Sequence, residues 1–254
     1  MKYFLNPFFN PFENQIKNNV IEFNSTGILF GDGKRNKIKL FKLDDKMINI
    51  KSFKIPNLIN KLVYNYFRKS KARRSFEYAT TLLEKGIGTP QPIAYFENHD
   101  FIGLKDSYYI SEHLDCDLTF RELVEISDYP DHEKILQQFT QFSFKLHEKG
   151  IEFLDHSPGN TLIKKTAEGD YSFYLVDLNR MSFHSEMSFD SRMKNLSRLT
   201  PKIEMTQEIS TEYARLSGEN PNLVFDTLWR YTSKFQCKYY RKIRIKKKLK
   251  FWKK

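Results

Sequence analysis

The sequence predicts an α+β fold in two parts, an antiparallel sheet followed by a mainly helical part. Apolar and polar residues alternate through much of residues 20–55, which is the two-residue period of half-buried strands. Beyond residue 115, apolar residues recur every three or four positions, which is the period of amphipathic helices. We therefore expect an N-terminal lobe at 1–112, a C-terminal lobe at 113–237 and a separate basic segment at 238–254.

Four runs between residues 20 and 54 are expected as strands: V-I-E-F, G-I-L-F, K-I-K-L-F-K-L and M-I-N-I-K-S-F-K. A short turn, G-D-G-K-R-N, joins the second run to the third. Its glycines Gly31 and Gly33, with Gly27 just upstream, allow backbone N–H groups to lie over phosphates. The short motif is weak by itself, because an ordinary hairpin turn at D-G is the better explanation of the motif alone.

A helix is expected over S-K-A-R-R-S-F-E-Y-A-T-T-L-L-E-K-G-I, from Ser70 to Ile87. Ser70 is a good N-cap and Gly86 a good C-terminal stop. Two further strands follow, T-P-Q-P-I-A-Y-F-E and S-Y-Y-I-S-E-H-L, before the pattern turns helical.

The chemistry is predicted by a stretch from residue 146 to residue 177. Asp155 is followed five residues later by Asn160, and Asp177 closes an alternating apolar run seventeen residues further on. Phosphoryl transfer needs a carboxylate to orient the acceptor hydroxyl, and an amide and a second carboxylate to hold magnesium. We therefore predict Asp155 as the catalytic residue and Asn160 and Asp177 as metal ligands. The alternative is three ordinary loop and strand-end residues.

A nucleotide would need a lysine for its phosphates and a glutamate to hold that lysine. Lys51 is preferred because Ile50 and Phe53 flank it on an inward-facing strand, and Lys54 is the alternative. Glu77 on the expected helix is preferred as the lysine's partner over Glu84. Any of these side chains could instead be a solvated surface charge.

The strand that ends near residue 112 is expected to lead into a hinge between the two lobes. Its backbone at Glu112, His113 and Leu114 is the expected contact for the adenine ring of ATP.

The net charge of +11 is concentrated at the C-terminus. The basic segment, residues 238–254, has ten Lys or Arg and no acid, so residues 1–237 carry only +1. A nucleic-acid face over the whole domain is therefore not supported. The two cysteines, Cys116 and Cys237, have no metal-like spacing and indicate a reducing compartment. We expect neither a signal peptide nor a membrane-spanning helix.

Together these motifs give the chain a family resemblance. It resembles the lipopolysaccharide kinases that have a protein-kinase-like fold and phosphorylate the Kdo sugar or inner-core heptose of lipid A. The resemblance covers roughly residues 25–180 and rests on I-N-I-K-S-F-K, K-A-R-R-S-F-E-Y-A, G-I-G-T-P-Q-P-I-A-Y, L-H-E-K-G-I-E-F-L-D with its Asn, and L-V-D-L-N-R. Two departures are Phe153-Leu154 in place of a His before Asp155, and D-L-N in place of D-F-G at Asp177.

The resemblance implies the cofactors ATP and Mg²⁺, and a lipid A-linked Kdo or core sugar as the acceptor. It also implies a monomer in the cytoplasm, peripheral on the inner face of the bacterial inner membrane. Arg180 and the basic run 68–74 are candidates for contacts with the anionic glycolipid. The basic segment is expected to bind the anionic membrane surface.

Three other functions remain open from the sequence. A soluble phosphotransferase for sugars or antibiotics shares several of the motifs, although the basic segment argues against it. A pseudokinase scaffold would bind a partner without transferring phosphate, but the full set of predicted catalytic residues is present. A nucleic-acid-binding role ranks last, because only the basic segment supports it.

Overall fold

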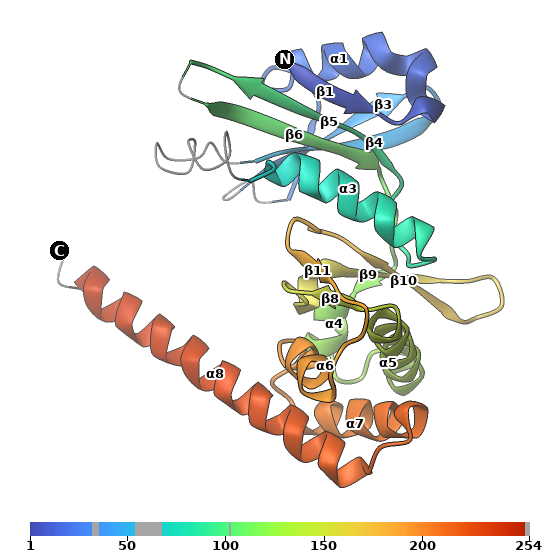
Figure 1. The fold of residues 1–254 in the computed structure, drawn as a ribbon, viewed down its shortest axis with the longest axis vertical. Coiled ribbons are helices and arrows are strands. Elements are labelled where there is room, and N and C mark those ends of the chain that lie inside the picture. The colour runs from blue at the N-terminus through green and yellow to red at the C-terminus, as the bar shows by residue number, and fades with distance from the viewer. Residues whose placement is uncertain (32–35, 54–67, 102, 252–254) are drawn as a thin grey trace. The chain divides into compact units, whose positions relative to one another are not determined.

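The computed structural model describes residues 1–31, 36–53, 68–101 and 103–251, and it forms two compact units (Figure 1). Unit 1 comprises Met1–Asp115 and Tyr174–Arg180, and unit 2 comprises Cys116–Phe173 and Met181–Lys254. Each unit has its own apolar core.

Unit 1 is built on a six-stranded antiparallel sheet with the order β1–β5–β6–β4–β3–β2. The strands are β1 (Lys2–Leu5), β2 (Ile28–Phe30), β3 (Lys37–Leu43), β4 (Lys46–Ser52), β5 (Pro92–His99) and β6 (Leu104–Glu112). The antiparallel sheet that the alternating pattern predicts is confirmed. Five of the six strands fall on runs expected from the sequence, and β1 at the sheet edge is the exception.

Helices cover both faces of this sheet. Helix α1 (Glu13–Ile21) follows the 3-10 helix η1 (Pro7–Phe12) and packs on one face, and α3 (Lys71–Glu84) packs on the other (Figure 1). The central strands β4, β5 and β6 are therefore covered on both sides, which makes them a rigid base for the side chains that they present, whereas the edge strand β2 is exposed.

The prediction of a strand at V-I-E-F, residues 20–23, is wrong. Val20 is the last buried residue of α1, and Phe23 is buried in the turn that follows the helix. Helix α1 buries only Ile16 and Val20 within a stretch of polar, Asn-rich sequence. One i, i+4 pair is too little periodicity to distinguish a short helix from an alternating strand.

Helix α3 begins and ends where its capping residues predict. The hydroxyl of Ser70 accepts a hydrogen bond from the backbone N–H of Arg73, at 3.0 Å. Gly86 has a left-handed φ of 64°, and the N–H of Ile87 donates to the carbonyl oxygen of Leu82 at 2.9 Å. This is the Schellman arrangement, which strongly favours glycine at that position.

Unit 2 is mainly helical. Its helices are α4 (Phe120–Glu125), α5 (His132–Glu148), α6 (Phe189–Leu196), α7 (Ile203–Ser217), α8 (Pro221–Phe251) and the 3-10 helix η2 (Pro158–Asn160). Its strands are β7 (Leu118–Thr119), β8 (Ile151–Phe153), β9 (Thr161–Lys165) and β11 (Met181–Phe183), while β10 (Tyr171–Leu175) crosses from unit 2 into unit 1. The helices share one apolar core to which α4, α5, α6, α7 and α8 all contribute.

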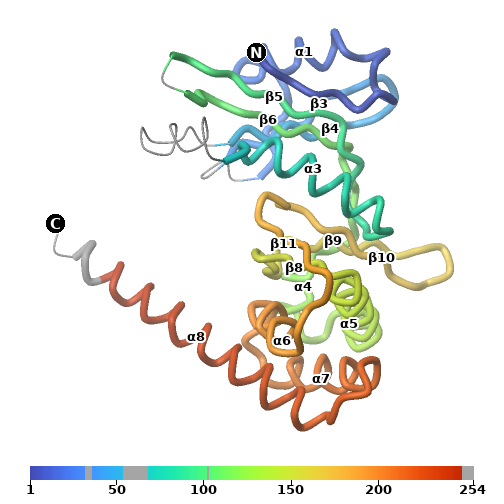
Figure 2. The backbone as a smooth tube through the Cα atoms, in the orientation of Figure 1, coloured from blue at the N-terminus to red at the C-terminus, as the bar shows by residue number. Residues whose placement is uncertain are grey.

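Helix α8 continues without a break through most of the basic segment. Its N-terminal half packs on α6 and α7, whereas residues 237–247 are exposed apart from the half-buried Ile243 (Figure 2). The structure thus makes residues 238–251 the second half of a long helix. Among the described residues, no helix is both long enough and apolar enough to cross a membrane.

Candidate active site

Strand β4 presents Lys51 on the sheet face that α3 covers. Ile50 is fully buried on the opposite face, in the core with α1. Because successive strand side chains point to opposite faces, Lys51 faces the other way. It pairs in register with Tyr109, which pairs with Tyr95, whose ring packs 5.6 Å from that of Phe76 on α3.

The ammonium group of Lys51 meets the carboxylate of Asp177 within unit 1. Lys51 Nζ donates to Asp177 Oδ1 at 2.7 Å, although the two residues are 126 positions apart. The Lys51 side chain is 15% exposed and that of Asp177 is 38% exposed, so this ion pair lies at the edge of the core. The structure therefore brings two predicted site residues together. The alternative lysine, Lys54, and the predicted Gly33 lie outside the described residues.

Asp177 is fixed by its own backbone and by two further residues. Its φ is 60°, in the left-handed region, which costs roughly 1 kcal/mol or more for a residue that has a Cβ. Asn179 Nδ2 donates to Asp177 Oδ1 at 2.7 Å, and the buried Arg74 of α3 donates to the carbonyl oxygen of Asn179 at 2.8 Å. Both bonds to Asp177 end on Oδ1, which leaves Oδ2 for a cation.

Sequence reasoning missed the roles of Asn179 and Arg74. The spacing D-L-N was visible as a departure from D-F-G, but this spacing does not by itself specify a hydrogen bond between the two side chains. Nothing in the sequence connects Arg74 with residue 179.

The expected ion pair between Lys51 and Glu77 is not formed, which corrects the prediction that Glu77 holds this lysine. Glu77 instead accepts from Lys69 Nζ at 2.8 Å and from Arg73 Nε at 2.9 Å. Arg73 lies one helical turn before Glu77 on α3, so the pair forms without any change in the backbone. Partial burial opposes ionisation of Glu77, but the hydrogen bonds from Lys69 and Arg73 outweigh it and lower the pKa of this carboxyl.

Most of the basic run 68–74 is used inside unit 1. Lys69 and Arg73 are bonded to Glu77, and Arg74 is only 6% exposed. These three cations are therefore poorly placed for the glycolipid contacts expected of the run. Arg180, the other candidate, is exposed.

The predicted hinge begins at Glu112, which is the last residue of β6. The N–H of Glu112 donates to Gln91 O at 2.9 Å, and that of His113 donates to Met47 O at 2.8 Å. These two N–H groups are therefore already used, and Leu114 is the hinge residue whose N–H has no bond among the described residues. The His113 ring lies edge-on to that of Phe30 on β2, with 5.4 Å between the ring centroids.

The glycines before β3 have different surroundings. A Cβ on Gly27, whose φ is 79°, would lie 2.5 Å from the Phe41 ring, so packing alone requires glycine there. Gly31 also has a φ of 79°, but no atom lies near the position of its missing Cβ. Of the two, Gly31 has the open surroundings that a phosphate contact would need.

The Asp155 loop, residues 154–160, connects β8 to β9 in unit 2. Asn160 Nδ2 donates to the carbonyl oxygen of Asp155 at 2.8 Å, so the side chain of one predicted site residue holds the backbone of the other. The N–H of His156 donates to Phe153 O at 3.0 Å, and that of Asn160 donates to Ser157 O at 2.9 Å. The Asp155 carboxylate lies 3.7 Å from Arg198 Nη1.

Comparison with known proteins identifies the family of this chain. A family model described as the lipopolysaccharide kinase (Kdo/WaaP) family matches residues 34–217. The chain belongs to this family. Its structure is also similar to that of WaaP, solved in complex with acyl carrier protein, with a TM-score of 0.64 and 15% sequence identity over 94% of this chain and 100% of that one. None of the curated proteins searched matches the chain.

The family match and the structural likeness confirm two predictions. The chain is a lipopolysaccharide kinase by family, and hence a phosphotransferase, and its α+β fold is kinase-like. The matched region includes Lys51, Glu77, Asp155, Asn160 and Asp177. It includes neither the three predicted glycines nor helix α8, which both lie outside residues 34–217.

A buried polar network supports the Asp155 loop of this lipopolysaccharide kinase, and sequence reasoning missed it. Asn195 of α6 donates through Nδ2 to Phe153 O at 2.8 Å. Its Oδ1 therefore faces the rings of His147 and His156, at 3.2 Å and 3.3 Å, and accepts from both. His147 Nδ1 is then the unprotonated nitrogen and accepts from the Tyr213 hydroxyl at 2.8 Å.

Both histidines of this network are neutral in the folded protein. Burial lowers the pKa of His147 to about 3 and that of His156 to about 4. His156 Nε2 has no hydrogen-bond partner among the described residues, which agrees with an unprotonated nitrogen. The only sequence signal was L-H-E-K-G-I, which contains His147, because Asn195 and Tyr213 belong to no motif.

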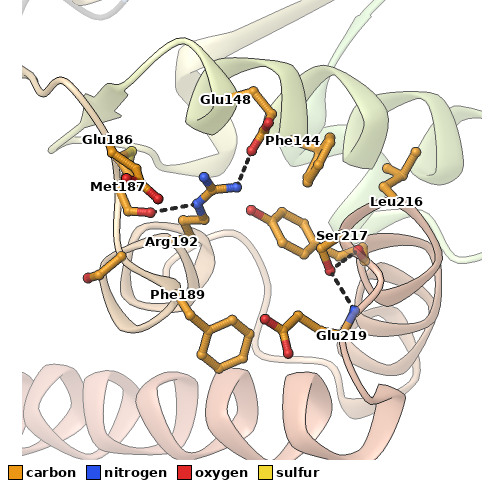
Figure 3. A pocket seen from close by; sticks show the side chains of 11 residues that line it. Phe144, Glu148, Glu186, Met187, Phe189, Arg192, Leu216, Ser217 and Glu219 are labelled. Atoms are coloured by element: carbon orange, nitrogen blue, oxygen red, sulfur yellow. Dashed lines mark hydrogen bonds and ion pairs between the residues drawn. The ribbon is translucent and has the colours of Figure 1, made fainter.

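A pocket of about 400 Å³ lies elsewhere in unit 2, between the end of α5, the start of α6 and the end of α7 (Figure 3). Arg192 extends into it, bonded to Glu148 and to Met187 O at 2.9 Å. Tyr213 also lines the pocket, and burial raises the pKa of its hydroxyl to about 12. None of the residues predicted for the active site lines this pocket.

Proposed function

We infer that this lipopolysaccharide kinase transfers the γ-phosphoryl group of ATP to a hydroxyl of the Kdo sugar, or of an inner-core heptose, linked to lipid A. The observation that carries the proposal is the contact between Lys51 and Asp177, at 2.7 Å. A kinase that uses ATP as its phosphate donor needs a phosphate-binding cation beside the carboxylate that holds the metal. The chain acts as a monomer in this proposal.

In this proposal the predicted residues share the work of the reaction. Asp155 orients the acceptor hydroxyl and accepts its proton, while Asn160 and Asp177 hold magnesium. Lys51 binds the α- and β-phosphates of ATP. Glu77 is bonded to Lys69 and Arg73 and has no part in this proposal.

The proposed ligands, the side-chain oxygens of Asn160 and Asp177, fit magnesium better than a softer metal. Mg²⁺ prefers oxygen ligands and keeps several positions for water and phosphate oxygens. Asp177 offers Oδ2, and Asn160 has its Oδ1 available because its Nδ2 is bonded to Asp155 O. The described residues contain no cluster of three His, Cys, Asp or Glu side chains that would form a complete metal site by themselves. Bound magnesium would supply positive charge for the transferring phosphate.

Mass spectrometry of the product tests the proposed reaction. Kdo-linked lipid A, incubated with the protein and ATP–magnesium, should gain one phosphate located on Kdo, and chelation of the metal should prevent the gain. A phosphate on heptose, with a heptose-containing acceptor, would select the second sugar. Transfer only to small soluble sugars would support a soluble phosphotransferase, and nucleotide binding without transfer would support a pseudokinase.

Lys51→Met is expected to raise the KM for ATP and reduce kcat, because the phosphates lose their cation on β4. Lys54→Met should change both constants little. Residues 51 and 54 differ by three positions and would face opposite sides of a regular strand. Steady-state kinetics at varied ATP concentration checks this, and equal losses in the two variants would reverse the choice of lysine.

The exposed half of α8 supports attachment to an anionic membrane surface. Its described side chains between residues 238 and 247 include six Lys or Arg, together with exposed Tyr239, Tyr240 and Ile245. At 1.5 Å per residue, positions 238–251 extend about 20 Å. Each cation near an anionic leaflet contributes about 1 kcal/mol, and aromatic rings are favoured at the headgroup level. The proposed location is the inner face of the bacterial inner membrane, where the acceptor lipid is present.

A chain ending at Cys237 is expected to lose binding to vesicles that contain anionic lipid. It should keep ATP binding and its activity on a soluble Kdo analogue. Binding of the intact chain should weaken steeply with salt, because exposed charges are screened over about 8 Å at physiological ionic strength. Vesicle sedimentation measures this. Unchanged sedimentation after truncation would remove the membrane role, and salt-sensitive binding to RNA alone would assign the basic segment to another partner.

A further inference from the structure

Arg198 lies between the Asp155 loop and helix α8. It follows the end of α6 by two residues, and its Nη1 donates to the carbonyl oxygen of Leu154 at 2.9 Å. The same nitrogen lies 3.7 Å from Asp155 Oδ1. A planar guanidinium has five fixed donors, so it can hold a backbone carbonyl while it faces a neighbouring carboxylate. Arg198 therefore contacts both the backbone and the side chain of the Asp155 loop.

An aromatic ring of α8 covers the guanidinium of Arg198. Its Cζ lies 5.3 Å from the centroid of the Phe235 ring, which is within the range of cation–π attraction. Phe235 is half-buried and precedes the exposed half of α8 by two residues, so it belongs to the last turn of α8 that packs on other elements of unit 2. The Arg198 side chain is 40% exposed and would otherwise have many rotamers open to it. The Leu154 carbonyl and the Phe235 ring together restrict it.

We propose that Arg198 is a positioning residue for Asp155, and that Phe235 holds Arg198 in place. The inference rests on the proposed role of Asp155 in orienting the acceptor hydroxyl. Such a group must be held in alignment with its substrate, since a displacement of about 1 Å costs about 10²-fold in rate. Phe235 lies beyond residue 217, where the family match ends, and it connects helix α8 to the Asp155 loop through Arg198.

Helix α8 also provides a matched control for this arrangement. Arg230 has its Cζ 5.2 Å from the ring of Tyr231 and its Nη2 3.7 Å from Asp190 Oδ1. The combination of arginine, ring and carboxylate is the same, but Asp190 is in α6 and does not belong to the Asp155 loop. Arg230→Gln and Tyr231→Leu thus remove a similar arginine–ring contact elsewhere in unit 2, and Tyr231→Leu also removes the hydrogen bond that the Tyr231 hydroxyl donates to Asp190.

The test compares Arg198→Gln and Phe235→Leu with these two controls in the full chain. With Kdo-linked lipid A and ATP–magnesium, we expect kcat to fall about 10- to 100-fold in Arg198→Gln and less in Phe235→Leu. The KM for ATP should not change, and Arg198→Lys should recover part of the lost kcat. The controls should keep wild-type kcat, and thermal melting should show all variants folded.

Hydrogen exchange supplies a second measurement that needs no acceptor. Amides of the peptide 151–160, including those of His156 and Asn160, should exchange faster in Arg198→Gln and Phe235→Leu and at the wild-type rate in the controls. Faster exchange together with lower kcat supports the proposal. Unchanged exchange, unchanged kcat, or equal losses in the controls would overturn it. If the wild-type chain transfers no phosphate to Kdo-linked lipid A, the proposed function fails. The hydrogen-exchange measurement is independent of that result, and unchanged exchange in Arg198→Gln would reject the link from Arg198 to the Asp155 loop.

Discussion

Asp177→Asn is expected to reduce phosphoryl transfer by about 10³-fold or more while the chain stays folded. The substitution keeps the size of the side chain but removes the charge that would hold magnesium, and losses of this order follow when an electrostatic partner of the transition state is removed. Asn is the informative replacement because it tolerates the left-handed backbone, φ 60°, better than Ala does. Single-turnover phosphoryl transfer and circular dichroism measure the two effects.

Asp44→Asn is the matched control for this prediction. Asp44 has almost the same backbone conformation, with φ 55°, in the exposed turn between β3 and β4. Its replacement should leave transfer at the wild-type rate, since it has no proposed part in the chemistry. Wild-type turnover in Asp177→Asn would remove this residue from the metal site, whatever the control does.

The structural features predicted best from the sequence are those that follow from a local pattern. Strand alternation alone puts Lys51 on the face opposite Ile50, whereas the 2.7 Å contact of Lys51 with Asp177 was not predicted. Helix α3 was predictable for the same reason, because its Ser70 cap and Gly86 stop depend only on neighbouring residues.

The interactions that sequence reasoning missed depend on tertiary structure. Glu77 had two possible sets of cations, and the nearer ones, Arg73 and Lys69, are its partners. The contact between Arg74 and Asn179 joins residues 105 apart. No pattern specifies such a choice, because it depends on how side chains are oriented after packing. The edge strand β1 was missed for a related reason, since its pairing with β5 is long-range.

The buried network around Asn195 also shows that the residues which hold a motif in place can lie far from it in the sequence. Asp155 and Asn160 stand out by their spacing, whereas the side chain that holds the backbone before them lies about 40 residues later. A buried amide that accepts from two rings and donates to a carbonyl satisfies three partner groups at once. Such groups carry little sequence signal, because their residue types are common on protein surfaces as well.

The folded protein is expected to lose stability as the pH falls from about 6.5 toward 4.5, because His147 and His156 are neutral in the fold. Their folded pKa values, about 3 and about 4, lie below the ordinary value of 6.5. The unfolded chain therefore binds more protons than the folded chain in this window, so stability is complete above about pH 6.5 and declines below it. Within this window each histidine lowers the free energy of unfolding by about 1.4 kcal/mol for each pH unit of acidification. The two together lower it by about 3 kcal/mol per pH unit. Most carboxylates are protonated only at lower pH.

Denaturant unfolding measured at several pH values checks this expectation. His156→Phe should reduce the slope between pH 6.5 and 4.5 by about half, since only His147 then remains to take up a proton. The change is tolerable because the His156 ring already lies among aromatic neighbours, 5.8 Å from Phe139 and 5.6 Å from Phe153. The exposed His99 serves as the control, and His99→Gln should leave the slope unchanged. If the free energy of unfolding of the wild-type protein does not change down to pH 4.5, the two rings are not both buried and neutral. If His156→Phe keeps the whole wild-type slope, the acid sensitivity belongs to other groups.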